Sequence, residues 1–381
     1  MNYLKSLLVV LCVAVFAAAA CSQSKSNYYL LVGGYTKAVA DKGISVYEFN
    51  AKDGSLQFRS VKGNIENPSY LAINSKEDKL YAVSEKGRPS GKVFAYQFDK
   101  TTGLLSLLNE TSSGGRGPCY ISIDKNSEHV FVANYSDGNI AAIALDGNGL
   151  LDSNRIQSIQ HTGSSIDKDN QKGPHGHSIV VSPDQRFALS ADLGLDRIFV
   201  YKYNPAGTTP LSEAEPAYVT VTPGSGPRHI CFHPNGKYVY VVNELNGSVD
   251  AFDYNKGVLK HKQNLTMLPD GFHGTIEAAD IHVSTDGKFL YASNREELNE
   301  IIIYSIAKNG LLKFVGRQSV LGAAPRNFVI DPTGKFLLVA NMNTNEIIVF
   351  LRDAKTGLLQ ATNNKITTTG PACMKFIQTP H

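Results

Sequence analysis

The sequence predicts an all-β fold, a seven-bladed β-propeller with four antiparallel strands per blade. Three observations carry this prediction. One strand-turn-strand pattern recurs seven times, its copies follow one another at intervals typical of propeller blades, and each end of the chain holds part of one copy. The abundance of glycine, tyrosine and phenylalanine fits short strands joined by tight turns.

The repeat is clearest in residues 226–243 and 324–341, which align without gaps. In each copy two alternating runs flank a turn such as His233-Pro234-Asn235-Gly236, in which proline fixes φ and glycine accepts a positive φ. A third run and a short fourth strand follow, which gives four strands per unit. Alignment brings seven residues to one equivalent position, 46 to 58 residues apart: Ser69, Cys119, His177, Arg228, Ala279, Arg326 and Ala372.

The two ends of the chain predict how the ring closes. Residues 28–34 match the second strand of the repeat but have no first strand before them, and residues 374–376 match the first strand but have nothing after them. We therefore expect the C-terminal strand to pair with three N-terminal strands, which protects edges that would otherwise pair with other chains. Residues 28–381 are expected to form one domain, with a single long polar insertion at 161–173.

The first twenty residues have the pattern of a secretory signal peptide. Lys5 precedes a short apolar run at residues 7–16, and four alanines lead to Cys21. This end resembles a bacterial lipoprotein signal, so we expect lipidation of Cys21, a polar tether at 21–27 and an anchored position facing the periplasm. The lipid is then the only expected contact with a membrane. Ordinary cleavage to a soluble periplasmic protein is the alternative, because Ala18 stands where leucine is commoner.

Charge and cysteine content exclude several functional classes. The formal net charge is only +3, which argues against nucleic acid as a partner. The cysteines outside the signal segment are odd in number and lack the spacing of a metal site, so we expect small buried side chains at Cys119, Cys231 and Cys373. No metal ion and no cofactor is expected.

The repeat also locates a candidate site. The start of the first strand and the end of the second strand of every blade lie on one face beside the axis, so the residues there should surround one mouth of the central channel. Arg228, Glu244 and Arg295 interrupt the repeat at these positions, which favours a functional role. The further candidates at this mouth are His175, His177, Arg326, Asn134, Asp192, Asn243 and Asn294. The recurrence of Asn or Asp after the second strand leaves substrate binding and backbone capping both open.

Four segments carry a family resemblance: Gly173-Pro174-His175-Gly176-His177-Ser178, Gly226-Pro227-Arg228-His229, Val242-Asn243-Glu244-Leu245 and Ala292-Ser293-Asn294-Arg295. They resemble motifs of the propeller-type 6-phosphogluconolactonase family, which includes the fungal carboxymuconate lactonising enzymes. The resemblance extends from residue 28 to 376. It implies a lactonase whose proposed active-site group falls on His177 (or His175), Arg228, Glu244 and Arg295.

The residue types suit the implied reaction. Lactone hydrolysis needs a base that deprotonates water and a cation where the oxyanion develops. Glu244 should stay ionised beside two arginines, and His177 is the alternative base. Arg228 and Arg295 are expected to clamp a small anionic lactone and to stabilise the oxyanion. The chain is expected to act as a monomer.

Two observations keep other functions open. A phosphorylated gluconolactone is a cytoplasmic metabolite, whereas this chain carries an export signal, so either the substrate is another acidic sugar lactone or the resemblance reflects the fold alone. One alternative is a cycloisomerase of the carboxymuconate type, which adds a carboxylate across a double bond. The other is a propeller of the cell envelope that binds a ligand or a protein without turnover.

Overall fold

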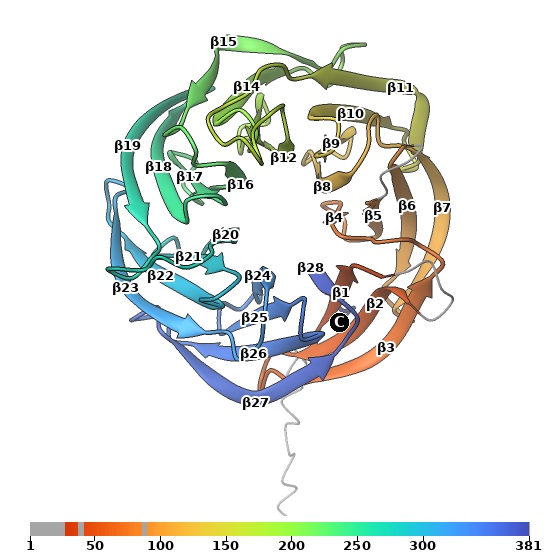
Figure 1. Ribbon diagram of the computed structural model, residues 1–381. Helices are drawn as coiled ribbons and strands as arrows, with labels where there is room; N and C mark the ends of the chain where they lie inside the picture. The colour runs from red at the N-terminus through yellow and green to blue at the C-terminus, as the bar shows by residue number, and fades with distance from the viewer. Residues whose placement is uncertain (1–26, 37–41, 86–89, 381) are drawn as a thin grey trace, which may run out of the picture.

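The computed structural model describes residues 27–36, 42–85 and 90–380. It confirms the predicted propeller: seven four-stranded antiparallel sheets surround a central axis (Figure 1). Within these ranges no helix is long and apolar enough to cross a bilayer. The expected signal peptide, Cys21 and most of the tether lie outside the described residues, and the first strand begins at Asn27.

Each blade contributes one innermost strand that lies next to the axis. The innermost strands are β4 (Leu71–Ile73), β8 (Pro118–Ile123), β12 (Gly176–Val181), β16 (Pro227–Phe232), β20 (Ala278–Val283), β24 (Pro325–Ile330) and β28 (Pro371–Gln378). The second strands are β5 (Lys79–Ser84), β9 (His129–Asn134), β13 (Phe187–Asp192), β17 (Tyr238–Asn243), β21 (Phe289–Asn294), β25 (Phe336–Asn341) and β1 (Asn27–Gly34).

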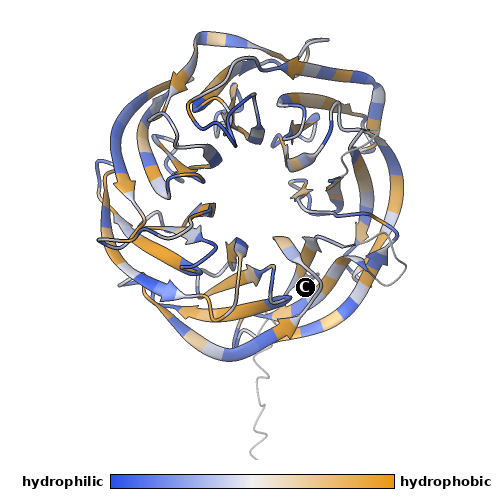
Figure 2. Cartoon of the chain, in the orientation of Figure 1, coloured by the Kyte–Doolittle hydropathy of each residue, from blue (hydrophilic) through white to orange (hydrophobic). Residues whose placement is uncertain are grey.

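Two further strands complete each blade on the outside. The third strands are β6 (Lys92–Asp99), β10 (Asn139–Leu145), β14 (Arg197–Tyr203), β18 (Ser248–Asn255), β22 (Glu300–Ile306), β26 (Glu346–Arg352) and β2 (Gly43–Asn50). The outermost strands are β7 (Leu104–Ser112), β11 (Leu151–Gln160), β15 (Leu211–Thr220), β19 (Val258–Thr266), β23 (Leu312–Ser319), β27 (Leu359–Thr367) and β3 (Leu56–Gly63). Hydrophilic and hydrophobic residues alternate along the outermost strands, as expected for strands with one face in water (Figure 2).

The apolar core lies between the blades. The second strands are almost entirely buried and the third strands largely so, and hydrophobic clusters join residues of neighbouring sheets. One polar contact recurs at these interfaces: a tyrosine of a second strand donates its hydroxyl to a glycine carbonyl in the next blade, at 2.8 to 2.9 Å, in the pairs Tyr81–Gly149, Tyr240–Gly310 and Tyr291–Gly357. Each of these three buried hydroxyls is thereby satisfied, and each of the three contacts fixes one blade to the next.

The closing blade has the predicted composition. Strand β28 pairs with β1 in antiparallel register from Tyr28 opposite Gln378 to Gly33 opposite Cys373, and the sheet order is β28-β1-β2-β3. Cys119 and Cys373 are buried, Cys231 is partly buried, and all three thiols are free.

The polar insertion at 161–173 is attached to the blade beside it. Buried Gln171 donates to the carbonyl of Leu193, and His161 Nδ1 donates to Asp192 at 2.6 Å. These bonds hold the segment that leads into β12 against the end of β13. The long loop therefore supports the face of the ring on which the candidate site lies.

Candidate active site

A backbone irregularity explains why one position of the repeat carries the candidate residues. His177, Arg228 and Arg326 are each the extra residue of a β-bulge at the start of an innermost strand. In β16, for example, Pro227 lies opposite Asn243 and His229 lies opposite Val242, which leaves Arg228 unpaired. The same shift occurs at the other two positions. A bulge redirects a side chain out of the regular alternation, and bulges often lie next to active sites.

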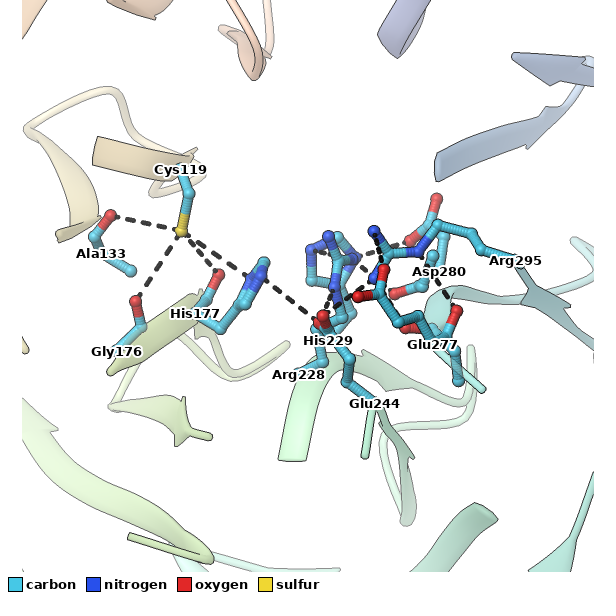
Figure 3. Close-up of polar contacts among 12 residues, drawn as sticks. Cys119, Ala133, Gly176, His177, Arg228, His229, Glu244, Glu277, Asp280 and Arg295 are labelled. Carbon is cyan, nitrogen blue, oxygen red and sulfur yellow. Dashed lines mark hydrogen bonds and ion pairs between the residues drawn. The ribbon is translucent and has the colours of Figure 1, made fainter. Parts of the chain in front are cut away.

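Glu244 is the centre of the charged group on this face. It follows β17 directly, and its Oε2 accepts a hydrogen bond from Arg228 Nε at 2.6 Å while its Oε1 accepts one from Arg295 Nη2 at 2.9 Å. His177 Nε2 lies 3.7 Å from Oε2. Figure 3 shows these four side chains pointing toward one another from three neighbouring blades. The structure thus brings together the four residues predicted to act in catalysis.

The charges in this group determine its protonation state. Burial raises the pKa of Glu244, but Arg295, Arg228 and Arg326 outweigh burial and hold the pKa below its usual value. Burial lowers the pKa of His177 well below its usual value, and Arg228 acts in the same direction. Near neutral pH the site therefore combines an ionised carboxylate, a neutral imidazole and charged guanidinium groups.

A second layer fixes Arg228 in place. Arg228 Nη1 donates to the carbonyl of Ala279 at 2.6 Å and to His229 Nε2 at 3.0 Å, and His229 Nδ1 donates to Asp280 at 2.8 Å. Because Nε2 accepts a hydrogen bond, this imidazole is neutral with its proton on Nδ1. Burial and Arg228 lower the pKa of His229 to about 4, which agrees with that geometry.

Asp280 is a residue that the sequence analysis missed. It is buried and also accepts hydrogen bonds from His282 and Asn327. The signal for it was present: Asp280 is a carboxylate in a strand whose neighbours are apolar. A buried charge of this kind requires several donors, and here the donors come from three blades.

Four predicted substrate-binding residues are fully buried: Asn134, Asp192, Asn243 and Asn294. Asn134 donates to the carbonyl of Ser113, and Asn243 donates to Ser248 and Asp250. Asp192 accepts from His161 and from the backbone N–H groups of His175 and Gly194. The bonds of Asn134 and Asp192 to backbone groups fit a capping role, whereas Asn243 contacts only side chains and the buried Asn294 side chain has no hydrogen bond within the described residues.

The two remaining candidates lie close to the group without joining its ion pairs. The ring of His175 stacks on Tyr135 with 4.5 Å between centroids, and its Nδ1 donates to the Tyr135 carbonyl. His177, rather than His175, is therefore the histidine beside Glu244. Arg326 lies over the ring of Tyr35 at 5.1 Å. Burial lowers the pKa of Arg326, but Tyr35, Glu85 and Glu244 raise it by more.

Comparison with known proteins identifies the family. Residues 29–376 match the family described as "Lactonase, 7-bladed beta-propeller". The chain belongs to this family. It is 38% identical to a 6-phosphogluconolactonase of Formosa agariphila, with 92% of this chain and all of the relative aligned, and 34% identical to a 6-phosphogluconolactonase of Bacillus subtilis, with 92% and 99% aligned.

A solved structure of this family is similar over its full length. It is described as the periplasmic gluconolactonase of Pseudomonas aeruginosa, with a TM-score of 0.89 and 36% identity, covering 93% of this chain and all of that chain. At this identity the likeness extends to sequence as well as fold.

Proposed function

We propose that this chain is a lactone hydrolase that opens the ring of a gluconolactone-type acidic sugar lactone. Family membership supports the proposal, and so do relatives that are named for gluconolactones with and without a phosphate. The observation that carries it is the Glu244 carboxylate, held between Arg228 and Arg295 with His177 beside it. Such a group offers a base, a cation and a water-orienting imidazole within one site.

In the proposed reaction Glu244 accepts a proton from a water molecule that His177 helps to orient. The water oxygen forms a bond to the lactone carbonyl carbon, and the carbonyl electrons move to the oxygen to give a tetrahedral oxyanion. When this species collapses, the bond between the carbonyl carbon and the ring oxygen breaks. The ring oxygen takes the proton back from Glu244, so that lactone and water yield one hydroxy acid.

Arg228 is suited to stabilise the oxyanion. Its Nε and Nη1 are engaged by Glu244, His229 and Ala279, whereas Nη2 has no hydrogen bond within the described residues. A guanidinium that is already held in place and has one nitrogen free can donate to the developing oxyanion without any rearrangement of the site during the reaction. Arg295 acts mainly by keeping Glu244 ionised and in position.

Substitution of the central carboxylate tests the proposal. Glu244→Gln removes the base, and Glu244→Asp moves the carboxylate away from the substrate because its side chain is one methylene shorter. Both variants should therefore lower kcat/KM for lactone hydrolysis by about 100-fold or more. The aspartate variant keeps the charge that compensates the two arginines and should therefore remain folded. Glu213→Gln, on the exposed side of β15, is the matched control.

Rates are measured by acid release from glucono-δ-lactone and its 6-phosphate, with circular dichroism to verify folding. Wild-type rates in both Glu244 variants would refute the assignment of the base. Tight binding of an acid without turnover of any lactone would instead identify a binding protein.

We also propose that the chain is exported, anchored through a lipid on Cys21, and active as a monomer. The N-terminal pattern supports export, and the relative from Pseudomonas aeruginosa is described as periplasmic. Cys21→Ala should move the protein from the membrane fraction to the soluble fraction, and light scattering of the purified chain should give the mass of one chain. A soluble wild-type protein would refute the anchor.

A further inference from the structure

We propose that Arg326, supported by Tyr35, binds the anionic substituent of the substrate, a phosphate ester at the end of the sugar lactone away from the reacting carbonyl. This subsite deepens the proposed lactonase function and rests on it. It assigns one arginine of the site to substrate recognition and the other two to the chemistry.

The other two arginines have little capacity left for a substrate anion. Arg228 is 1% exposed, and its Nε and Nη1 are engaged. Arg295 is 4% exposed, and its three nitrogens contact Glu244, the carboxylate of Glu277 and the carbonyls of Glu277 and Ala278. Two carboxylates thus already compensate these two guanidinium groups.

Arg326 differs from both in its contacts. Within the described residues its guanidinium forms no hydrogen bond and no ion pair, and it is only partly buried. The bulge in β24 directs its side chain out of the strand alternation, as it does for His177 and Arg228. A guanidinium with its donors free is the group that best matches the oxygens of a phosphate or a carboxylate.

The contact with Tyr35 holds this guanidinium in position before a ligand binds. The Arg326 side chain lies over the Tyr35 ring, which leaves the N–H groups at the guanidinium edge available. The Tyr35 hydroxyl donates to Glu85 at 2.8 Å, and its backbone N–H donates to the carbonyl of Gly370. The aromatic ring is therefore fixed from two sides before any ligand binds.

The order of the blades places Arg326 beside the reacting group, on the side that leads toward the closing blade. His177, Arg228, Glu244 and Arg295 belong to the three consecutive blades of β12, β16 and β20. Arg326 belongs to the blade of β24, which directly follows that of β20 around the ring, and Tyr35 and Glu85 belong to the next two blades, those of β28 and β4 (Figure 1). A six-carbon lactone has its carbonyl at one end and its C6 substituent at the other. Such a molecule matches a site in which a guanidinium without a direct ion pair or hydrogen bond in the described residues follows the reacting group around the mouth of the channel.

Kinetics with two substrates test the subsite. The variants are Arg326→Met and Arg326→Lys, and the substrates are 6-phosphoglucono-δ-lactone and unphosphorylated glucono-δ-lactone. For the phosphorylated substrate, Arg326→Met should raise KM by about 10- to 100-fold with little change in kcat, because it removes a charge-assisted hydrogen bond. For the unphosphorylated substrate, the rise in KM in Arg326→Met should be smaller by about tenfold, and Arg326→Lys should be intermediate for both substrates. Arg186→Met, exposed in the turn between β12 and β13, is the control.

A binding measurement separates the failure of this subsite from the failure of the proposed function. Calorimetry with 6-phosphogluconate and gluconate needs no turnover, and wild type should prefer the phosphorylated acid, whereas Arg326→Met should not. Selective binding without hydrolysis of either lactone would refute the lactonase proposal and retain the subsite. Hydrolysis with equal losses for both substrates in Arg326→Met, or no preference between the two acids in wild type, would overturn the subsite.

Discussion

Arg228 joins the proposed chemistry to a network that does not touch the substrate. Glu244 holds its Nε, and His229 accepts from its Nη1 while donating to Asp280. Asp280 in turn accepts from Asn327, whose Oδ1 accepts the backbone N–H of Met374 in the closing strand. A change in this network should therefore alter the position of Arg228 before it alters any direct contact of the site.

Replacement of His229 by phenylalanine tests this positioning role. His229→Phe keeps the ring but removes the acceptor for Arg228 and the donor to Asp280. We expect kcat to fall by about tenfold, in line with the loss of one charge-assisted hydrogen bond, with a smaller change in KM. In the double variant with Arg228→Lys, the rise in the activation free energy should be smaller than the sum of the rises in the two single variants, because the two residues act through one contact. His233→Phe, in a turn on the far face, is the control; equal effects of the two histidine variants would contradict the role.

His229 also makes the stability of the fold depend on pH. The folded pKa of His229 is about 4 and its unfolded value is near 6.5, so between these values the unfolded chain binds a proton that the folded chain does not. Wild type should therefore lose on the order of 3 kcal/mol of stability as pH falls from about 6.5 to 4. His177 acts in the same direction, and Asp280 contributes only below about pH 4. Urea unfolding at several pH values should show a shallower slope in His229→Phe than in wild type.

At the scale of strands, the sequence predicted the repeat correctly and left its irregularities unseen. Alternation of apolar residues and the proline-glycine turns located the first three strands of each blade, because those features depend only on local pattern. The bulges depend on pairing with a second strand, which no local pattern records. The short β4 is a difference of the same kind, because it begins at Leu71, after the aligned Ser69, whereas the other innermost strands begin one residue before their aligned position.

For the candidate site as well, the sequence predicted the residues that break the repeat but not the contacts that support them. Breaks in the repeat located Arg228, Glu244 and Arg295, because an unusual residue at one position stands out against six copies. The supporting contacts did not stand out. His229 and Asp280 belong to different blades, and their pairing depends on the distance between adjacent innermost strands. Likewise, only the three-dimensional contacts distinguish an ion-paired Arg295 from an unpaired Arg326.

At the scale of the whole molecule, stability depends on closure of the ring. Each core lies between two blades, so a blade that loses its neighbour exposes apolar surface to water. Strand β28 supplies the fully buried residues Cys373, Met374 and Ile377 to the closing blade. Burial of one such side chain contributes about 1.5–3 kcal/mol, and the net stability of a domain is about 5–15 kcal/mol. Loss of this one strand is therefore comparable to the stability of the entire fold.

Deletion of residues 371–381 should consequently abolish the cooperative thermal transition of the propeller, measured by circular dichroism. The deletion leaves the edge of β1 unpaired and uncovers the side of the β24 blade that β28 contacts. A synthetic peptide of residues 371–381 should restore both the transition and lactone hydrolysis, since the missing strand carries no residue of the proposed reacting group. Removal of residues 380 and 381 alone, which lie beyond β28, should leave the melting temperature unchanged. A truncated chain that melts cooperatively at the wild-type temperature would show that the other six blades fold without closure. It would also show that the Asp280 network does not depend on its contact with β28.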